Sequence, residues 1–209
     1  MDPQPPPASM YWEGKSGKNS AVYERSCRNG PDVAPIISTF VADAGANVPA
    51  VDPVLVAQQA VAQMKLAGPD IASPRPAGRY AIGMPMWMWV HKSATTYGPN
   101  ATTATAGGVT VAATAKVTKI AWQMGDGSTV TCAGPGTTYT ASYGMRKSPT
   151  CGHTYTRTSA ARKGGKYLVT AIATWTVDWQ VNEGGETGQF TETRQSQAPV
   201  AIGEVQVVK

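Results

Sequence analysis

The chain has 209 residues, of which 42% are hydrophobic and only 15% are charged, and its formal net charge is +5. With 22 Gly and 16 Pro residues, this composition suits a β-rich secreted protein better than a helical enzyme of the cytosol. Solubility accounts for the mild positive charge, although dispersed cations also suit anionic walls, membranes or nucleic acid. No run of about 18 apolar residues occurs, which excludes a membrane-spanning helix.

Residues 1–50 are expected to form an irregular, Pro-rich N-terminal extension. Its start lacks the basic residues and the apolar stretch of a signal peptide, so we expect the sequence to begin within a longer protein, with any signal or anchor outside it. Gly14-Lys15-Ser16 matches the end of a phosphate-binding loop, but Ser9 stands where that motif requires a glycine. We therefore expect no nucleotide and no other cofactor. Apolar residues return between Val33 and Val41, where a short strand is an open alternative.

One helix is predicted, over residues 52–66. Asp52 can accept a hydrogen bond from the free amides of the first turn, and Pro53 stands at the first helical position, where its missing N–H costs nothing. An apolar stripe at helical spacing follows, and Gly68-Pro69 ends the helix. The stripe consists of Val54, Leu55, Ala57, Val61 and Met64.

Strands are expected from residue 80 onward. Residues 80–90 are apolar on both faces of a strand, and Pro85 indicates a bend or bulge within them. Residues 93–107 are mainly small and polar and are predicted to form a loop. Apolar and polar residues then alternate over 109–118, and the phase of the alternation changes near Lys119, so a bulge or turn must lie there.

The strongest strand prediction covers residues 167–181. Every odd-numbered residue of this segment is apolar and most of the even-numbered ones are polar, which is the pattern of a strand with one buried face. A turn at residues 183–186 then leads to a returning segment, residues 188–208, which is expected to close the sheet.

Two short motifs precede that strand. An aromatic strand end at Trp122 leads into the tight turn Gly125-Asp126-Gly127, and the sequence Cys-Gly-His-Thr-Tyr occupies residues 151–155. The turn, the His-Thr-Tyr and the long strand, in this order, resemble the PKD domain, an extracellular β-sandwich of the immunoglobulin-like kind. The resemblance covers residues 105–182. The rest of the chain is similar to secreted PKD-like proteins of actinomycetes.

The resemblance implies a mainly β fold with three regions. An immunoglobulin-like, PKD-like β-sandwich would occupy residues 105–209, and the short helix with a strand, residues 51–104, would pack on it. The irregular extension, residues 1–50, would precede both.

The resemblance also implies a structural role for the motif residues, with the imidazole and phenol of His153 and Tyr155 packed against the turn. It further implies a disulfide between Cys132 and Cys151, since these two places come together in a PKD-like arrangement. Cys27 would then be left for a partner upstream or in another molecule, whereas three free thiols in a reducing cytosol are the alternative. The motif residues are Trp122, Gly125, Asp126, Gly127, His153 and Tyr155.

Catalysis and metal binding have little support in the sequence. Asp126 lacks the further acids that a calcium loop requires, so we expect no metal. A hydrolase that uses His153 as a base, or the pair Glu183 and Glu186, is the alternative, but no nucleophile-elbow or zinc-protease motif occurs. We therefore expect that the protein is not an enzyme.

Two segments are candidates for binding. The first is a basic loop that would suit anionic wall polymers, although a solvated loop is the favoured interpretation; its cations are Arg157, Arg162, Lys163 and Lys166. The second contains Trp87 and Trp89, which would form an adaptable binding face if exposed. The alternation of these two with Met86 and Met88 favours burial in the core.

The resemblance implies a scaffold or adhesion module rather than a catalyst. We therefore expect a secreted or cell-surface protein that acts as a non-catalytic binding or structural module for a protein, a glycan or the cell wall. Neither nucleic acid nor a membrane span is expected. An accessory subunit of a larger secreted assembly, joined through Cys27 or the Pro-rich segment, is the alternative.

Overall fold

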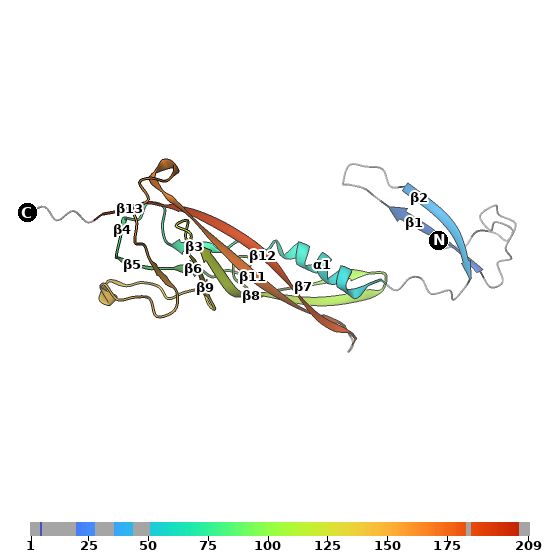
Figure 1. Cartoon of the computed structure of the whole chain (residues 1–209). Coiled ribbons are helices and arrows are strands. Elements are labelled where there is room, and N and C mark those ends of the chain that lie inside the picture. The colour runs from blue at the N-terminus through green and yellow to red at the C-terminus, as the bar shows by residue number, and fades with distance from the viewer. Residues whose placement is uncertain (1–4, 6–19, 28–35, 44–50, 183–184, 205–209) are drawn as a thin grey trace, which may run out of the picture. The chain divides into compact units, whose positions relative to one another are not determined.

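The computed structural model of the chain describes residue 5 and residues 20–27, 36–43, 51–182 and 185–204. It divides into two units, Met1–Ala50 and Val51–Lys209, which are described separately (Figure 1). The phosphate-loop-like residues 14–16 lie outside the described residues, as do Glu183 and the end of the expected returning segment, residues 205–208.

The first unit contains two antiparallel strands, β1 (Ser20–Cys27) and β2 (Ile36–Asp43). Their pairing places Ser20 opposite Asp43 and Cys27 opposite Ile36. The prediction of an irregular extension is therefore wrong for β1, whereas β2 agrees with the short strand that the sequence left open between Val33 and Val41. The polar residues of β1 show no period-two pattern, and only β2 had an apolar signal.

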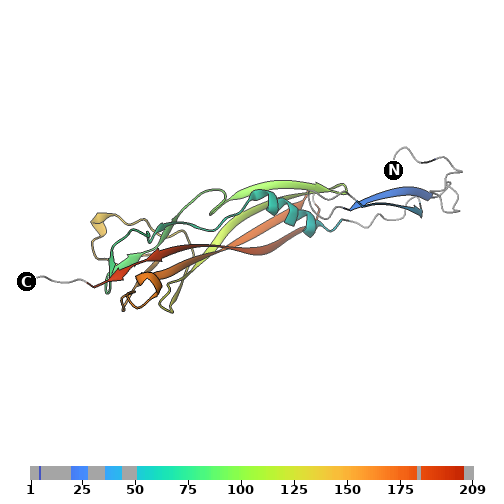
Figure 2. The same ribbon diagram turned by 90° about the horizontal axis from the view of Figure 1, so that it is seen from above.

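The second unit is built around one long antiparallel sheet in the order β12-β11-β8-β7. β9 also pairs with β8, beyond the end of β7: β7 pairs with residues 109–115 of β8 and β9 with residues 120–123. The sheet curls along its length (Figures 1 and 2). The unit is mainly β, and its curled sheet is consistent with a β-sandwich. The bounds are β7 Asn100–Ala106, β8 Val109–Gln123, β9 Thr129–Cys132, β11 Tyr167–Val181 and β12 Thr187–Val200.

β11 has the bounds that the sequence predicts, and its odd-numbered residues face the core, with Val169 and Trp175 both 0% exposed. The change of phase near Lys119 is a bulge in β8. Lys119 pairs with Thr174 and Val117 with Trp175, so Thr118 is the additional residue. This prediction is confirmed.

β7 corrects the expectation of a loop at residues 93–107. It leads into β8 through a tight turn at Gly107 and Gly108, whose φ angles of 54° and 80° are left-handed and suit glycine. Small Ala and Thr side chains gave β7 no apolar signal. The strand also crosses the boundary expected at residue 104, so residues 51–104 and the sheet belong to one unit.

α1 (Pro53–Met64) lies along β7 and β8 (Figure 2). The side chain of Asp52 accepts a hydrogen bond of 2.9 Å from the amide of Val54, as expected for the cap. The helix ends at Lys65 in a left-handed conformation, before Gly68-Pro69. Its inward face is rotated from the predicted stripe, because Leu55 is 59% exposed. The buried residues are Val56, Ala57, Ala60, Val61 and Met64. No helix in the described part of the chain is long and apolar enough to cross a membrane.

Short strands gather at one end of the sheet, where Figure 1 labels β4, β5 and β13. The segment 80–90 forms three strands rather than one bent strand, because Gly83 turns the chain with a φ of 75° and Met88 separates the last two. β3 pairs with β6, β4 with β13 and β5 with β10. The bounds are β3 Asp70–Ser73, β4 Tyr80–Ala81, β5 Pro85–Trp87, β6 Trp89–His91, β10 Gly152–Thr154 and β13 Ile202–Gly203.

Candidate binding groove

The tight turn after β8 is organised by the carboxylate of Asp126. Its Oδ1 accepts hydrogen bonds from the amide and the hydroxyl of Ser128, at 2.9 and 2.5 Å. Its Oδ2 lies 2.9 Å from Nε2 of His153 on β10. Gly125 has a φ of 77°, and a Cβ at this position would lie 2.9 Å from the carbonyl oxygen of Leu168, so the turn requires glycine there.

Tyr155 joins this turn to the long strand. Its hydroxyl donates a hydrogen bond of 2.8 Å to the carbonyl oxygen of Met124, and its ring stacks on Tyr167 at 5.0 Å between centroids. The ring of His153 meets Tyr155 edge-on at 4.5 Å. The structure therefore brings the motif residues of the sequence together around the turn, with Trp122 buried beside them at 1% exposure.

The electrostatics of this cluster fit a structural role. Burial raises the pKa of Asp126, but the hydrogen bonds from Ser128 and the contact with His153 outweigh it, and the net pKa lies below the ordinary value. Burial, together with the nearby Asp126 and Tyr167, raises the pKa of Tyr155. At neutral pH the carboxylate is therefore charged and the phenol is neutral.

Asp126, His153 and Ser128 do not have the geometry of a catalytic relay. The hydroxyl of Ser128 lies 3.5 Å from Nε2 of His153, the same nitrogen that faces Asp126. In a serine hydrolase the acid and the serine contact opposite nitrogens of the imidazole. Glu186 is exposed, and no group of three His, Cys, Asp or Glu residues in the described ranges could hold a metal ion.

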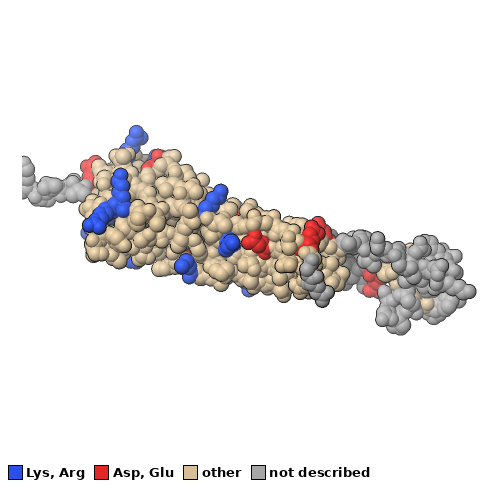
Figure 3. Space-filling model, turned by 90° about the horizontal axis from the view of Figure 1, so that it is seen from below, with Lys and Arg blue, Asp and Glu red and all other residues tan. Residues whose placement is uncertain are grey.

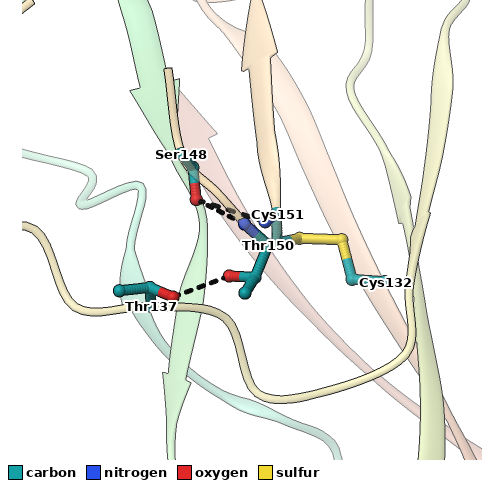
Figure 4. The surroundings of a disulfide bond; sticks show 5 residues. All are labelled: Cys132, Thr137, Ser148, Thr150 and Cys151. Atoms are coloured by element: carbon teal, nitrogen blue, oxygen red, sulfur yellow. Dashed lines mark hydrogen bonds between the residues drawn. A yellow bond between two sulfur atoms is a disulfide. The ribbon is translucent and has the colours of Figure 1, made fainter. Parts of the chain in front are cut away.

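A disulfide joins Cys132, at the end of β9, to Cys151, just before β10, with a Cα–Cα distance of 5.6 Å. It closes the loop of residues 133–150 (Figure 4). The hydroxyls of Thr137 and Thr150 hydrogen-bond across the base of this loop at 2.9 Å. The bridge that the resemblance implies is thus present, and it fixes both ends of the loop. Cys27 ends β1, and its pairing lies outside what the structure describes.

The loop of residues 133–150 forms one wall of a groove with a volume of about 250 Å³. The segment from the end of β3 to the start of β6 forms the opposite wall. Aromatic rings, methionines and two arginines dominate the lining. The lining residues are Ser73, Arg75, Arg79, Tyr80, Met84, Pro85, Met86, Trp87, Trp89, Tyr139, Gly144 and Met145.

Trp87 lines this groove and also contacts the loop that forms one of its walls. It is 4% exposed, because Tyr143 packs on its ring at 4.6 Å and Tyr139 meets it edge-on at 5.5 Å. Its indole N–H donates a hydrogen bond of 2.8 Å to the carbonyl oxygen of Arg146. The loop wall is therefore attached to β5 by stacking and by a hydrogen bond.

The expectation that both tryptophans belong to the core holds only for Trp87, because Trp89 is half-buried. Both line the groove, and the neighbouring Met86 and Met88 are buried. Tyr139 and Met145 leave 40% and 65% of their surface exposed at the opposite wall. Sequence reasoning missed that wall. The tyrosines between the two cysteines were the available signal for it.

The basic loop after β10 is exposed at all four predicted cations, Arg157, Arg162, Lys163 and Lys166. The guanidinium of Arg162 lies 5.5 Å from the ring centre of Tyr167. In Figure 3, Lys and Arg side chains gather toward the end of this unit at which Figure 1 labels β4, β5 and β13. The groove and the basic loop both belong to that end, because Tyr80 of β4 pairs with Ile202, whose carbonyl accepts from Ser159.

Comparison of the chain with known protein families, curated proteins and solved structures gives no match.

Proposed function

We propose that the chain is a non-catalytic, extracellular binding module that recognises a glycan of the cell surface through the groove around Trp87. The observation that carries the proposal is the lining of the groove, in which aromatic rings from both walls face a cavity of about 250 Å³. The immunoglobulin-like, PKD-type form of the sandwich is part of the proposal. The arrangement of Asp126, His153 and Tyr155 supports it.

Aromatic rings suit a sugar because they present flat apolar faces to the C–H groups of a pyranose, and their polar edges remain in water. Trp89 is half-buried and Tyr139 is 40% exposed, so neither residue is fully covered by the protein. The cavity lies just below the range of about 300 to 1,000 Å³ that is typical of small-molecule sites. It therefore suits a single ring at a time, with the rest of a polymer outside.

The residues that line the groove support binding without cleavage as part of the proposal. A glycosidase needs two carboxyl groups beside the scissile bond, one as acid and one as base or nucleophile. Neither Asp, Glu nor His is found among the residues that line the groove. The disulfide supports the extracellular location, since such bonds persist in oxidising compartments.

Sedimentation with insoluble polymers tests the proposal. Purified protein is incubated with isolated bacterial cell wall, chitin and cellulose, and the bound fraction is measured across a salt series. We expect binding to at least one of them, and Trp89→Ala should weaken it about tenfold, or about 1.4 kcal/mol. Leu55→Ala is the control, since it removes an exposed apolar side chain on α1.

Two results would contradict the proposal. Absence of binding to all three polymers would indicate a protein partner instead. Equal binding by wild type and Trp89→Ala would remove the groove as the site.

A further inference from the structure

Two arginines stand in the short segment between β3 and β4, and both line the groove. The segment is anchored at each end. The buried hydroxyl of Ser73 donates 2.7 Å to the carbonyl oxygen of Trp87, and the amide of Arg75 donates 2.9 Å to the hydroxyl of Tyr80. A hydrogen bond of 2.9 Å from the amide of Gly78 to the carbonyl of Arg75 closes the turn between them. The backbone that carries Arg75 and Arg79 is therefore fixed by hydrogen bonds to Trp87 and Tyr80, two aromatic residues that line the groove.

The charge of these arginines is not balanced within the groove. Its lining includes no Asp or Glu, and neither Arg75 nor Arg79 has an ion-pair partner among the described residues. Nε of Arg75 donates 3.3 Å to the carbonyl oxygen of Ala72, which fixes the base of the guanidinium. Two cations beside an apolar cavity, without an acid, are complementary to an anion. A guanidinium prefers a carboxylate or phosphate that can accept two parallel hydrogen bonds.

Further cations extend this positive region. Lys147 lines a neighbouring hollow, which shares Pro85 and Met86 with the groove. The exposed Arg162 and Lys163 belong to the basic loop, which lies at the same end of the sheet as β4, β5 and β13. A polymer with repeated negative charges would therefore be attracted to this end before one of its units enters the groove.

We infer that the ligand is an acidic glycan, and that Arg75 and Arg79 bind the carboxylate of a uronic acid unit whose ring lies on Trp89 and Tyr139. The inference rests on the proposed function and names its substrate class. A carboxylate attached directly to the sugar ring suits this arrangement, because one rigid unit contacts the aromatic faces and the guanidinium groups together. A phosphate polymer is a different ligand and becomes an arm of the test.

The test uses the full chain and short, soluble probes. Binding of trigalacturonate is measured by calorimetry and compared with that of its fully methyl-esterified form, which has the same rings without the charge. We expect the acid to bind at least about tenfold more tightly than the ester. Tripolyphosphate is the third probe, and it should compete with trigalacturonate only weakly.

Arg79→Gln and Arg75→Gln identify the residues responsible. Each should weaken trigalacturonate about tenfold and leave the ester unchanged. Arg79→Gln is the cleaner variant, because Arg75 also holds Ala72 through its side chain. Lys119→Gln removes the same charge from an exposed site on β8 and should bind as wild type does. Thermal unfolding of each variant checks that the fold is intact.

The failures of the inference and of the proposed function differ. Equal binding of acid and ester, or an equal loss of both in Arg79→Gln, would overturn acid recognition and leave a neutral-glycan groove. Strong competition by tripolyphosphate would make the site a general anion site and overturn the uronic acid. Failure of both trisaccharides to bind would overturn the inference, whereas the proposed function fails if the insoluble polymers are not bound either, or if Trp89→Ala binds them as wild type does.

Discussion

The indole N–H of Trp87 donates a hydrogen bond to the carbonyl oxygen of Arg146, 59 positions later in the chain. This bond joins the short strand β5 to the loop of residues 133–150. Because both segments line the groove, the shape of the groove depends on a contact that is remote in sequence.

Trp87→Phe tests this contact, because it keeps an aromatic ring and removes the donor. The carbonyl of Arg146 then loses its partner, and we expect a loss of about 1–3 kcal/mol in the free energy of unfolding. Faster proteolysis within residues 133–150 should accompany it. Trp89→Phe is the control, since Trp89 is half-buried and its indole makes no hydrogen bond among the described residues. A similar loss in both variants would argue against a special role for the bond.

The disulfide should stabilise both the fold and the groove. Replacing Cys132 and Cys151 by Ser removes a bridge across 19 positions, and we expect a loss of roughly 3 kcal/mol by denaturant unfolding. Glycan binding should weaken as well, because Tyr139 and Met145 lie within the loop that the bridge closes. Cys27→Ser leaves the bridge in place, so this control should unfold as wild type does and should respond to reductant in the same way. Full stability of the double variant would contradict the prediction.

Asp126 should make stability depend on pH in the acidic range. Its pKa is lower in the folded chain than the ordinary value of 3.8, so its contribution is fully present above that value. The contribution is lost as the pH falls through the folded pKa. We therefore expect Asp126→Asn to be less stable than wild type at pH 7, with a difference that shrinks on acidification.

Urea unfolding at a series of pH values measures this difference. Asp178→Asn serves as the control, because Asp178 forms an exposed ion pair with Lys116 at 3.7 Å and should contribute little. A difference between Asp126→Asn and wild type that stays constant down to strongly acidic pH would show that the charge of Asp126 is not what stabilises the turn.

Gly136 is required for the course of the loop beside β6. Its φ is 84°, and an added Cβ would collide with the backbone carbonyl oxygen of Met88. Gly108 has a similar φ of 80° but open space around it, so Gly108→Ala should cost only the left-handed strain of about 1–2 kcal/mol. Gly136→Ala should lower the free energy of unfolding by clearly more than this. It should also weaken glycan binding, because Gly136 belongs to the loop that forms one wall of the groove. Thermal unfolding and a binding assay measure the two effects. Equal costs at the two positions would refute the collision.

The elements with a strong local pattern could be predicted from the sequence. β11 alternates without a break, and α1 begins with a cap and a proline, so both were found within a few residues. β7 was not predicted, because its side chains are small. It is covered by α1 and paired with β8, and neither contact is visible in its own sequence. The bulge at Thr118 was visible because it shifts the apolar residues of β8 to the other parity.

The site was harder to predict for a physical reason. The contact between Asp126 and His153 at the turn was predicted from the resemblance to a known motif, and the structure places these two side chains in contact. The groove combines lining residues of two segments that are at least 50 positions apart, and these segments meet through the disulfide and the pairing of β5 with β10. Arg75 and Arg79 have no local signature, because what singles them out is a groove lining without Asp or Glu and the absence of an ion-pair partner among the described residues.

The position of the disulfide links the groove to the redox state of the chain. The long strands bury apolar residues that lie outside the loop closed by Cys132 and Cys151, among them Val111 and Trp175. Oxidation of the two thiols adds a covalent bond across the base of the loop that carries Tyr139 and Met145, beside the hydrogen bond from Trp87 to Arg146. A chain with reduced thiols would thus lack the covalent closure of one wall of the groove, so the shape of the groove would depend on the oxidation of Cys132 and Cys151.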